Sequence, residues 1–159
     1  MKNYKLIWLG IFCCLQPLIL FAQRGEMIRK AFLDPKSDQV LVVAHRGNWR
    51  SAPENSVAAI DSAIQMGVDI MEIDIHKTKD GQLILMHDDR VDRTTNGKGL
   101  IKDYTLAEIK KLKLKDKDGN LTEHIVPTLE EALLAGKGQI MFNLDKAYSV
   151  FDEVYAVLE

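Results

Sequence analysis

The feature that most constrains this chain is a series of short apolar runs that end in polar residues and are separated by helix-like segments. Residues 40–44 form a continuous apolar run rich in β-branched side chains, which is typical of a strand buried on both faces. Further strands are predicted at residues 69–77, 83–87 and 139–144. Because polar residues follow the C-terminal ends of the runs, the pattern predicts an α/β fold with a site at one end of its strands.

Helical spacing of apolar residues separates these strands. Residues 53–67 have this spacing, with a proline for the first turn and a glycine at the end. The segments 105–112 and 128–135 each begin with a threonine followed three residues later by a glutamate, the pattern of a capping box. A last helix is expected after Ser149 as its N-cap, and a short one at residues 27–32 in the lead-in.

The dipeptide Asp80-Gly81, between the second and third predicted strands, is a strong signal for a tight β-hairpin. A two-residue turn at this point would place Asp74 opposite His87, with Glu72 on the same face as Asp74. The connection is also too short to hold a crossover helix between parallel strands. The hairpin therefore predicts that these two carboxylates and this histidine gather on one side of one ribbon.

The strand ends carry the groups that metal-assisted hydrolysis of a phosphate ester requires, namely His45, Arg46, Glu72, Asp74 and His87. Carboxylates can hold a divalent cation, an arginine can clamp a phosphate, and histidines titrate near neutral pH as acid and base. Oxygen ligands without cysteine favour Mg²⁺, Ca²⁺ or Mn²⁺ over zinc. Taken alone, Glu72 and Asp74 also fit a solvated strand face, and His45 also fits a histidine in the core. The occurrence of all five residues in this order is what indicates catalysis.

The motifs around these groups resemble the glycerophosphodiester phosphodiesterase family. The matching segments are 43–47 (Val-Ala-His-Arg-Gly), 52–56 (Ala-Pro-Glu-Asn-Ser), 71–81, 84–89 and 93–97, and the resemblance extends to Asp145. It implies a (β/α)8 TIM-type barrel, truncated here to about its first four strands, with a small insertion after the third strand. It also implies cleavage of small-molecule glycerophosphodiesters to an alcohol and glycerol 3-phosphate, with a divalent metal ion as cofactor.

The same resemblance implies a role for each matching residue. His45 and His87 match the catalytic acid/base pair, and Arg46 matches the contact to the substrate phosphate. Glu72 and Asp74 match two of the metal ligands.

The fourth predicted strand departs from the family pattern, which has a glutamate followed two residues later by a lysine, both facing the site. This chain has Asn143-Leu144-Asp145-Lys146. Asp145 then replaces the glutamate as third metal ligand, whereas strand alternation predicts that Lys146 points to the opposite face. Glu54 matches the acidic residue of the Pro-Glu-Asn motif and is expected beside the substrate.

Residues 1–22 are typical of a secretory signal peptide. Lys2 and Lys5 precede a strongly apolar stretch, and Ala22 is a small residue suited to the cleavage site. A retained membrane anchor is the alternative, but the stretch is short for a spanning helix and Pro17 interrupts it. We therefore expect export to the periplasm or the medium, with no stable membrane anchor after cleavage.

Both cysteines of the chain, Cys13 and Cys14, lie inside this predicted signal. Neither follows a small residue, so a lipoprotein signal is not favoured. Once the signal is removed, the chain has no thiol, which excludes disulfides, cysteine metal sites and thiol nucleophiles.

The length of 159 residues has room for one domain. We expect a lead-in segment at residues 23–39 and the phosphodiesterase domain at residues 40–159, incomplete at its C-terminus, since such barrels have eight strands and about 250 residues. A net charge of -2 gives no support for nucleic-acid binding. The alternative function is a catalytically silent module of the same fold that binds phosphodiesters or glycans, although a binder needs no acid/base pair.

Overall fold

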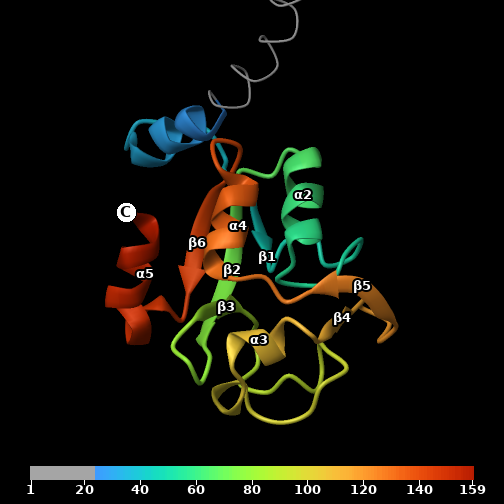
Figure 1. Ribbon diagram of the computed structural model, residues 1–159. Helices are drawn as coiled ribbons and strands as arrows, with labels where there is room; N and C mark the ends of the chain where they lie inside the picture. The colour runs from blue at the N-terminus through green and yellow to red at the C-terminus, as the bar shows by residue number, and fades with distance from the viewer. Residues whose placement is uncertain (1–23) are drawn as a thin grey trace, which may run out of the picture.

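The computed structural model describes residues 24–159, and the predicted signal peptide lies outside this part of the chain (Figure 1). Strand β2 (Ile70–Lys77) is the centre of a four-stranded sheet. Strands β1 (Val43–His45) and β6 (Met141–Asp145) run parallel to it on either side. Strand β3 (Leu83–Leu85) returns antiparallel along the last residues of β2. This arrangement is that of a truncated barrel of the predicted type, and the three parallel strands end side by side.

Two helices cover the sheet and contact each other (Figure 1). Helix α2 (Val57–Gln65) begins later than predicted, because Ser56 caps it by accepting a hydrogen bond from the backbone of Ala59; Pro53 lies in the preceding loop and not in the first turn. Helix α4 (Leu129–Gly136) has the predicted capping box. Between these helices and the sheet lies the main core, which includes Ala59, Ile60, Met71, Ile73 and Leu129.

The predicted insertion after β3 folds against the end to which the parallel strands point (Figure 1). It contains a 3-10 turn (Ile101–Asp103), helix α3 (Leu106–Ile109) and an antiparallel pair of strands, β4 (Lys113–Lys115) and β5 (Leu121–Ile125). The capping box of α3 is confirmed, but the helix is shorter than predicted because the chain soon enters β4, and this strand pair was not expected from the sequence.

The insertion has its own small core, and β3 joins it to the main one. Leu83 and Leu85 pack into the main core, whereas Ile84 and Met86 pack into the second cluster. Because successive side chains of a strand point to opposite faces, one short strand serves both cores and fixes the insertion relative to the sheet.

The C-terminal segment contains a 3-10 turn (Ala147–Val150) followed by α5 (Phe151–Leu158). Ser149 was expected to cap this helix, which is wrong: Ser149 lies within the 3-10 turn and Val150 is the N-cap. Helix α5 is held beside the sheet by the buried side chain of Val154.

The expectation that residues 40–44 are buried on both faces is also wrong. Val40 is 84% exposed and Val43 is 53% exposed, because in the described part of the chain β1 has a neighbour on one side. The lead-in helix is confirmed and spans residues 24–33. Across residues 24–159, the helices are all too short or too polar to cross a bilayer.

Candidate active site

Three carboxylates meet where the parallel strands end. Glu72, Asp74 and Asp145 each offer an oxygen within 4.8 Å of the others. Alternation along β2 puts Glu72 and Asp74 on one face, and the parallel register pairs Asp74 with Asp145 of β6. The set predicted from the sequence as metal ligands is therefore brought together.

The electrostatics of this cluster suit a bound cation. Burial raises the pKa of Glu72, and the nearby carboxylates of Asp74 and Asp145 raise it further. The hydrogen bond from the backbone N–H of Arg46 lowers this pKa but does not outweigh them. Asp74 is 1% exposed, and its Oδ1 is buried without a hydrogen-bond partner in residues 24–159. A divalent cation would satisfy this oxygen and reduce the repulsion between the carboxylates, so the donor set fits a metal ion.

The other oxygen of Asp74 is held by Asn55. Asn55 Nδ2 donates to Asp74 Oδ2 at 2.9 Å, and the backbone N–H of Asp74 donates to Asn55 Oδ1 at 3.2 Å. Asn55 is buried and has a left-handed backbone with φ +54°, which asparagine tolerates better than most residues. The sequence alone does not predict this role, and its signal is the asparagine of the Pro-Glu-Asn motif.

The guanidinium of Arg46 lies between two carboxylates. Its Nη1 is 3.3 Å from Glu54 Oε1, and its Nε is 3.5 Å from Asp74 Oδ2. This Nε is buried without a hydrogen-bond partner in the described residues, and the backbone N–H of Arg46 donates to Glu72 Oε2 at 2.9 Å. The arginine predicted to bind phosphate is therefore beside the carboxylate cluster and retains an unused donor.

His45 is the last residue of β1. Its side chain is 66% exposed, and its Nε2 lies 3.9 Å from Glu72 Oε2. The exposure excludes the alternative reading of His45 as a core histidine. The ring is accessible to a substrate and is adjacent to the cluster.

The predicted pairing of Asp74 with His87 is wrong by one residue. The hairpin loop holds three residues, the last of them Gly81 in the left-handed conformation, and Asp74 therefore lies opposite Met86. His87 follows the end of β3, where the chain bends, so strand alternation does not decide where its side chain points.

The imidazole of His87 belongs instead to a network of charged groups. Its Nδ1 is 2.7 Å from Asp88 Oδ1. Arg93 donates to both oxygens of Asp88, at 2.8 and 2.9 Å, and to both oxygens of Glu54, at 2.8 Å each. Because the Asp88 carboxylate favours a proton on Nδ1, the Nε2 of His87 is left free for proton transfer.

The charges in this network stabilise one another. Hydrogen bonds from Arg93 hold the pKa of Asp88 well below its usual range. Burial raises this pKa and His87 lowers it, but the effect of Arg93 is the largest. Burial opposes ionisation of Glu54, but Arg93 and Arg46 outweigh it and lower its pKa; the pKa of Arg93 is raised. The sequence alone does not predict Asp88 or Arg93 as site residues, although both lie within matching motifs.

Lys146 also reaches the site, contrary to the prediction that it points to the opposite face. Its backbone is left-handed, with φ +62°, directly after β6 ends, so strand alternation no longer applies. Its Nζ lies 3.4 Å from Asp74 Oδ1 and donates to the backbone carbonyl of His87. His76 Nε2 lies 3.2 Å from the same carbonyl, so two side chains fix the backbone of His87.

Known proteins are similar to this chain in sequence and in fold. A curated glycerophosphodiester phosphodiesterase from Caldanaerobacter subterraneus subsp. tengcongensis is 45% identical over 109 residues, which cover 67% of this chain and 45% of that protein. A solved glycerophosphoryl diester phosphodiesterase from Parabacteroides distasonis superimposes with a TM-score of 0.71 at 30% identity, covering 84% of this chain and 48% of that one. This chain therefore spans less than half the length of these relatives.

A second solved structure is an Oleispira antarctica phosphodiesterase in complex with the product sn-glycerol-3-phosphate. It has a TM-score of 0.61 and 38% identity, covering 66% of this chain and 43% of that one. The sequence pattern of the Glycerophosphoryl diester phosphodiesterase family matches residues 45–159, most of the chain. The chain belongs to this family.

Proposed function

We propose that this protein is a metal-dependent phosphodiesterase that hydrolyses glycerophosphodiesters to an alcohol and glycerol 3-phosphate. The observation that carries the proposal is the convergence of Glu72, Asp74 and Asp145 beside the guanidinium of Arg46. The bound sn-glycerol-3-phosphate of the Oleispira relative supports the same product here.

Each side chain of the site has a separate role in the proposed hydrolysis. Arg46 holds the phosphate with the solvent-accessible part of its guanidinium, and Glu54 keeps this group in place. One of His45 and His87 accepts a proton from the attacking oxygen, and the other donates a proton to the leaving alcohol. Asp88 orients His87 through Nδ1, so that the imidazole presents Nε2.

Glu72, Asp74 and Asp145 are the proposed ligands of Mg²⁺, Ca²⁺ or Mn²⁺, because all three offer hard oxygen donors. When bound, such an ion would neutralise charge on the phosphate and activate the attacking oxygen.

The test is hydrolysis of glycerophosphocholine, glycerophosphoethanolamine and glycerophosphoinositol by the full-length protein, with and without a chelator. We expect turnover that is lost with the chelator and lost in the His45→Ala variant. A matched control is His124→Ala, since His124 lies in exposed β5 of the insertion. A folded, metal-loaded protein that turns over none of these diesters would support the silent binding module instead.

We further propose that the protein acts outside the cytoplasm, in the periplasm or the medium, after removal of residues 1–22. The basic start, the apolar stretch and Ala22 support this proposal. N-terminal sequencing of the exported protein should begin at Gln23. An uncleaved, membrane-bound product would favour the retained anchor.

A further inference from the structure

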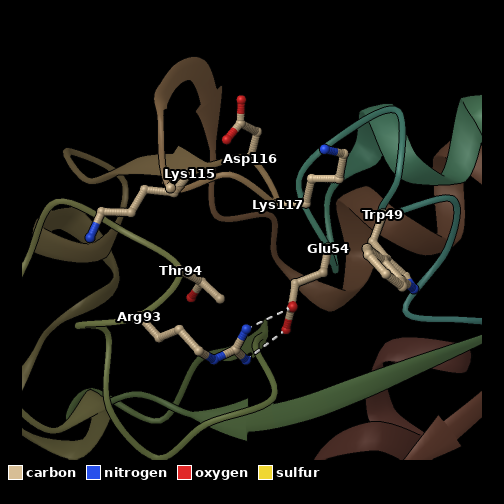
Figure 2. Close-up of a pocket in the computed structure, with 8 residues that line it drawn as sticks. Trp49, Glu54, Arg93, Thr94, Lys115, Asp116 and Lys117 are labelled. Carbon is tan, nitrogen blue, oxygen red and sulfur yellow. Dashed lines mark hydrogen bonds and ion pairs between the residues drawn. The ribbon is translucent and has the colours of Figure 1, made fainter.

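A cavity of 320 Å³ lies next to the Arg93–Glu54 ion pair, between the loop after β1 and the β4–β5 hairpin of the insertion (Figure 2). Figure 2 shows Trp49 and Glu54 on one side and Arg93 and Thr94 on the other. Lys115 and Lys117 come from the hairpin. The proposed hydrolysis uses Glu54 to hold Arg46 but leaves this space without a role.

The cavity is separated from the carboxylate cluster by a short chain of contacts. Glu54, which lines the cavity, is 3.3 Å from Arg46, and Arg46 is 3.5 Å from Asp74. Arg46, the proposed phosphate ligand, therefore lies between the carboxylate cluster and the wall of the cavity. We propose that this cavity binds the alcohol half of the diester and takes a hydroxyl-rich alcohol, such as inositol, in preference to a quaternary ammonium alcohol. This proposal rests on the proposed hydrolysis of glycerophosphodiesters.

Both carboxylates of the cavity already accept hydrogen bonds from protein groups. Glu54 accepts two hydrogen bonds from Arg93 and a third from Arg46. Asp116 accepts from the backbone N–H groups of Asp118 and Asn120, both at 2.9 Å, and from the side-chain amide of Asn120 at 3.1 Å. The lining has three cationic side chains, those of Arg93, Lys115 and Lys117, against these two carboxylates, so a positively charged alcohol would meet an excess of positive charge.

The cations are less completely paired. Lys115 Nζ donates to the backbone carbonyl of Asp92 at 3.0 Å and forms no ion pair within residues 24–159. Lys117 pairs with its exposed neighbour Asp118 at the rim, an arrangement that water weakens. The hydroxyl of Thr94 is buried without a partner in the described part of the chain. Hydroxyl oxygens of a polyol would accept hydrogen bonds from the ammonium group of Lys117, which Figure 2 shows on the same side as Trp49.

Trp49 supplies a flat surface for a ring. The guanidinium of Arg50 lies 5.4 Å from the centre of the Trp49 ring, so one cation already occupies a face of this indole. On the remaining face, a quaternary ammonium group would meet the positive charge of Lys117, which lines the same cavity. The C–H face of a cyclic polyol can pack on the indole without this repulsion.

Binding can be measured apart from turnover through the fluorescence of Trp49. The sequence has two tryptophans, and Trp8 lies in the segment proposed to be removed on export, so Trp49 is the reporter in the mature protein. In the mature His45→Ala protein, glycerophosphoinositol should bind about tenfold more tightly than glycerophosphocholine, a difference of about 1.4 kcal/mol. Lys117→Glu should reduce this preference at least threefold, whereas Lys137→Glu, on an exposed helix end outside the cavity, should leave it unchanged.

Equal binding of the two diesters, tighter binding of the choline diester, or identical behaviour of the two lysine variants would overturn the proposal. Turnover assays on the wild-type protein separate it from the proposed function. Turnover of both diesters without selectivity would reject the role of the cavity and leave hydrolysis intact. Selective binding by a protein that hydrolyses neither diester would support the cavity and reject hydrolysis.

Discussion

Asn55 and Asp74 hold each other through two hydrogen bonds, one from the Asn55 amide to the Asp74 carboxylate and one from the Asp74 backbone to the Asn55 carbonyl oxygen. Each residue is 1% exposed. The pair ties the loop after β1 to β2 and so fixes the most deeply buried carboxylate of the cluster.

Replacing Asn55 with aspartate should destabilise the protein. The Asn55→Asp side chain has the same size and tolerates the left-handed backbone, but it puts an oxygen where Asp74 Oδ2 accepts a hydrogen bond. We expect the metal-free unfolding free energy, measured by urea denaturation, to fall by about 1–3 kcal/mol. Asn55→Gly, which keeps the backbone conformation and adds no charge, should lose less. Equal losses in both variants would show that charge repulsion is unimportant here.

Asp145→Asn should separate metal binding from folding. Removing one of three neighbouring carboxylates relieves repulsion, so the metal-free variant should melt at a higher temperature than the wild type. Saturating Mg²⁺, Ca²⁺ or Mn²⁺ should stabilise the wild type by about 2.7 kcal/mol at a hundredfold excess over Kd, and the variant by much less. Asp152→Asn, in exposed α5, is the matched control. An undiminished metal-induced shift in Asp145→Asn would remove this residue from the ligand set.

Arg93 should matter for turnover more than for substrate affinity, because it positions Asp88 and through it His87. Arg93→Lys keeps the charge but cannot bridge two carboxylates with a planar fork. We expect kcat to fall about tenfold or more with a small change in KM, since misplacing an acid or base removes part of its contribution. Arg90→Lys, on the exposed surface nearby, should behave like the wild type. A rise in KM alone would assign Arg93 to substrate binding.

Stability should decline in acid because the pKa values of Glu54 and Asp88 are lowered in the folded protein. A carboxylate with a lowered folded pKa stabilises the native state above its unfolded pKa of about 4, and this contribution is lost as pH falls through the folded value. Urea denaturation from pH 7 downwards should show the loss beginning below about pH 5. Arg93→Met should flatten this dependence, and an unchanged slope would contradict the assigned cause.

Lys146→Gly should cost activity without costing stability. Glycine adopts the left-handed backbone at this position readily, so the free energy of unfolding should stay the same or rise. Loss of the ammonium group removes the contacts to Asp74 and to the His87 carbonyl, and we expect a drop in kcat of about tenfold to a hundredfold. Full activity in this variant would show that Lys146 is dispensable, in line with its displaced position in the sequence.

Much of this protein is determined by local sequence. The capping boxes of α3 and α4 form within four residues of chain, and the apolar runs of β2 and β3 are recognisable because each strand must bury its side chains. Motif order was also sufficient to select Glu72, Asp74 and Asp145 as one cluster, which parallel pairing of β2 and β6 brings together.

Tertiary structure decided where single side chains point. A left-handed residue after β6 turned Lys146 into the site, and a three-residue loop shifted the hairpin so that Asp74 faces Met86. Arg93 meets Glu54 across 39 positions of the sequence. Such outcomes depend on one backbone torsion or on contacts between distant segments, and neither produces a periodic pattern in the sequence. Strands and caps depend instead on residues that are neighbours in the sequence, so their patterns can be recognised there.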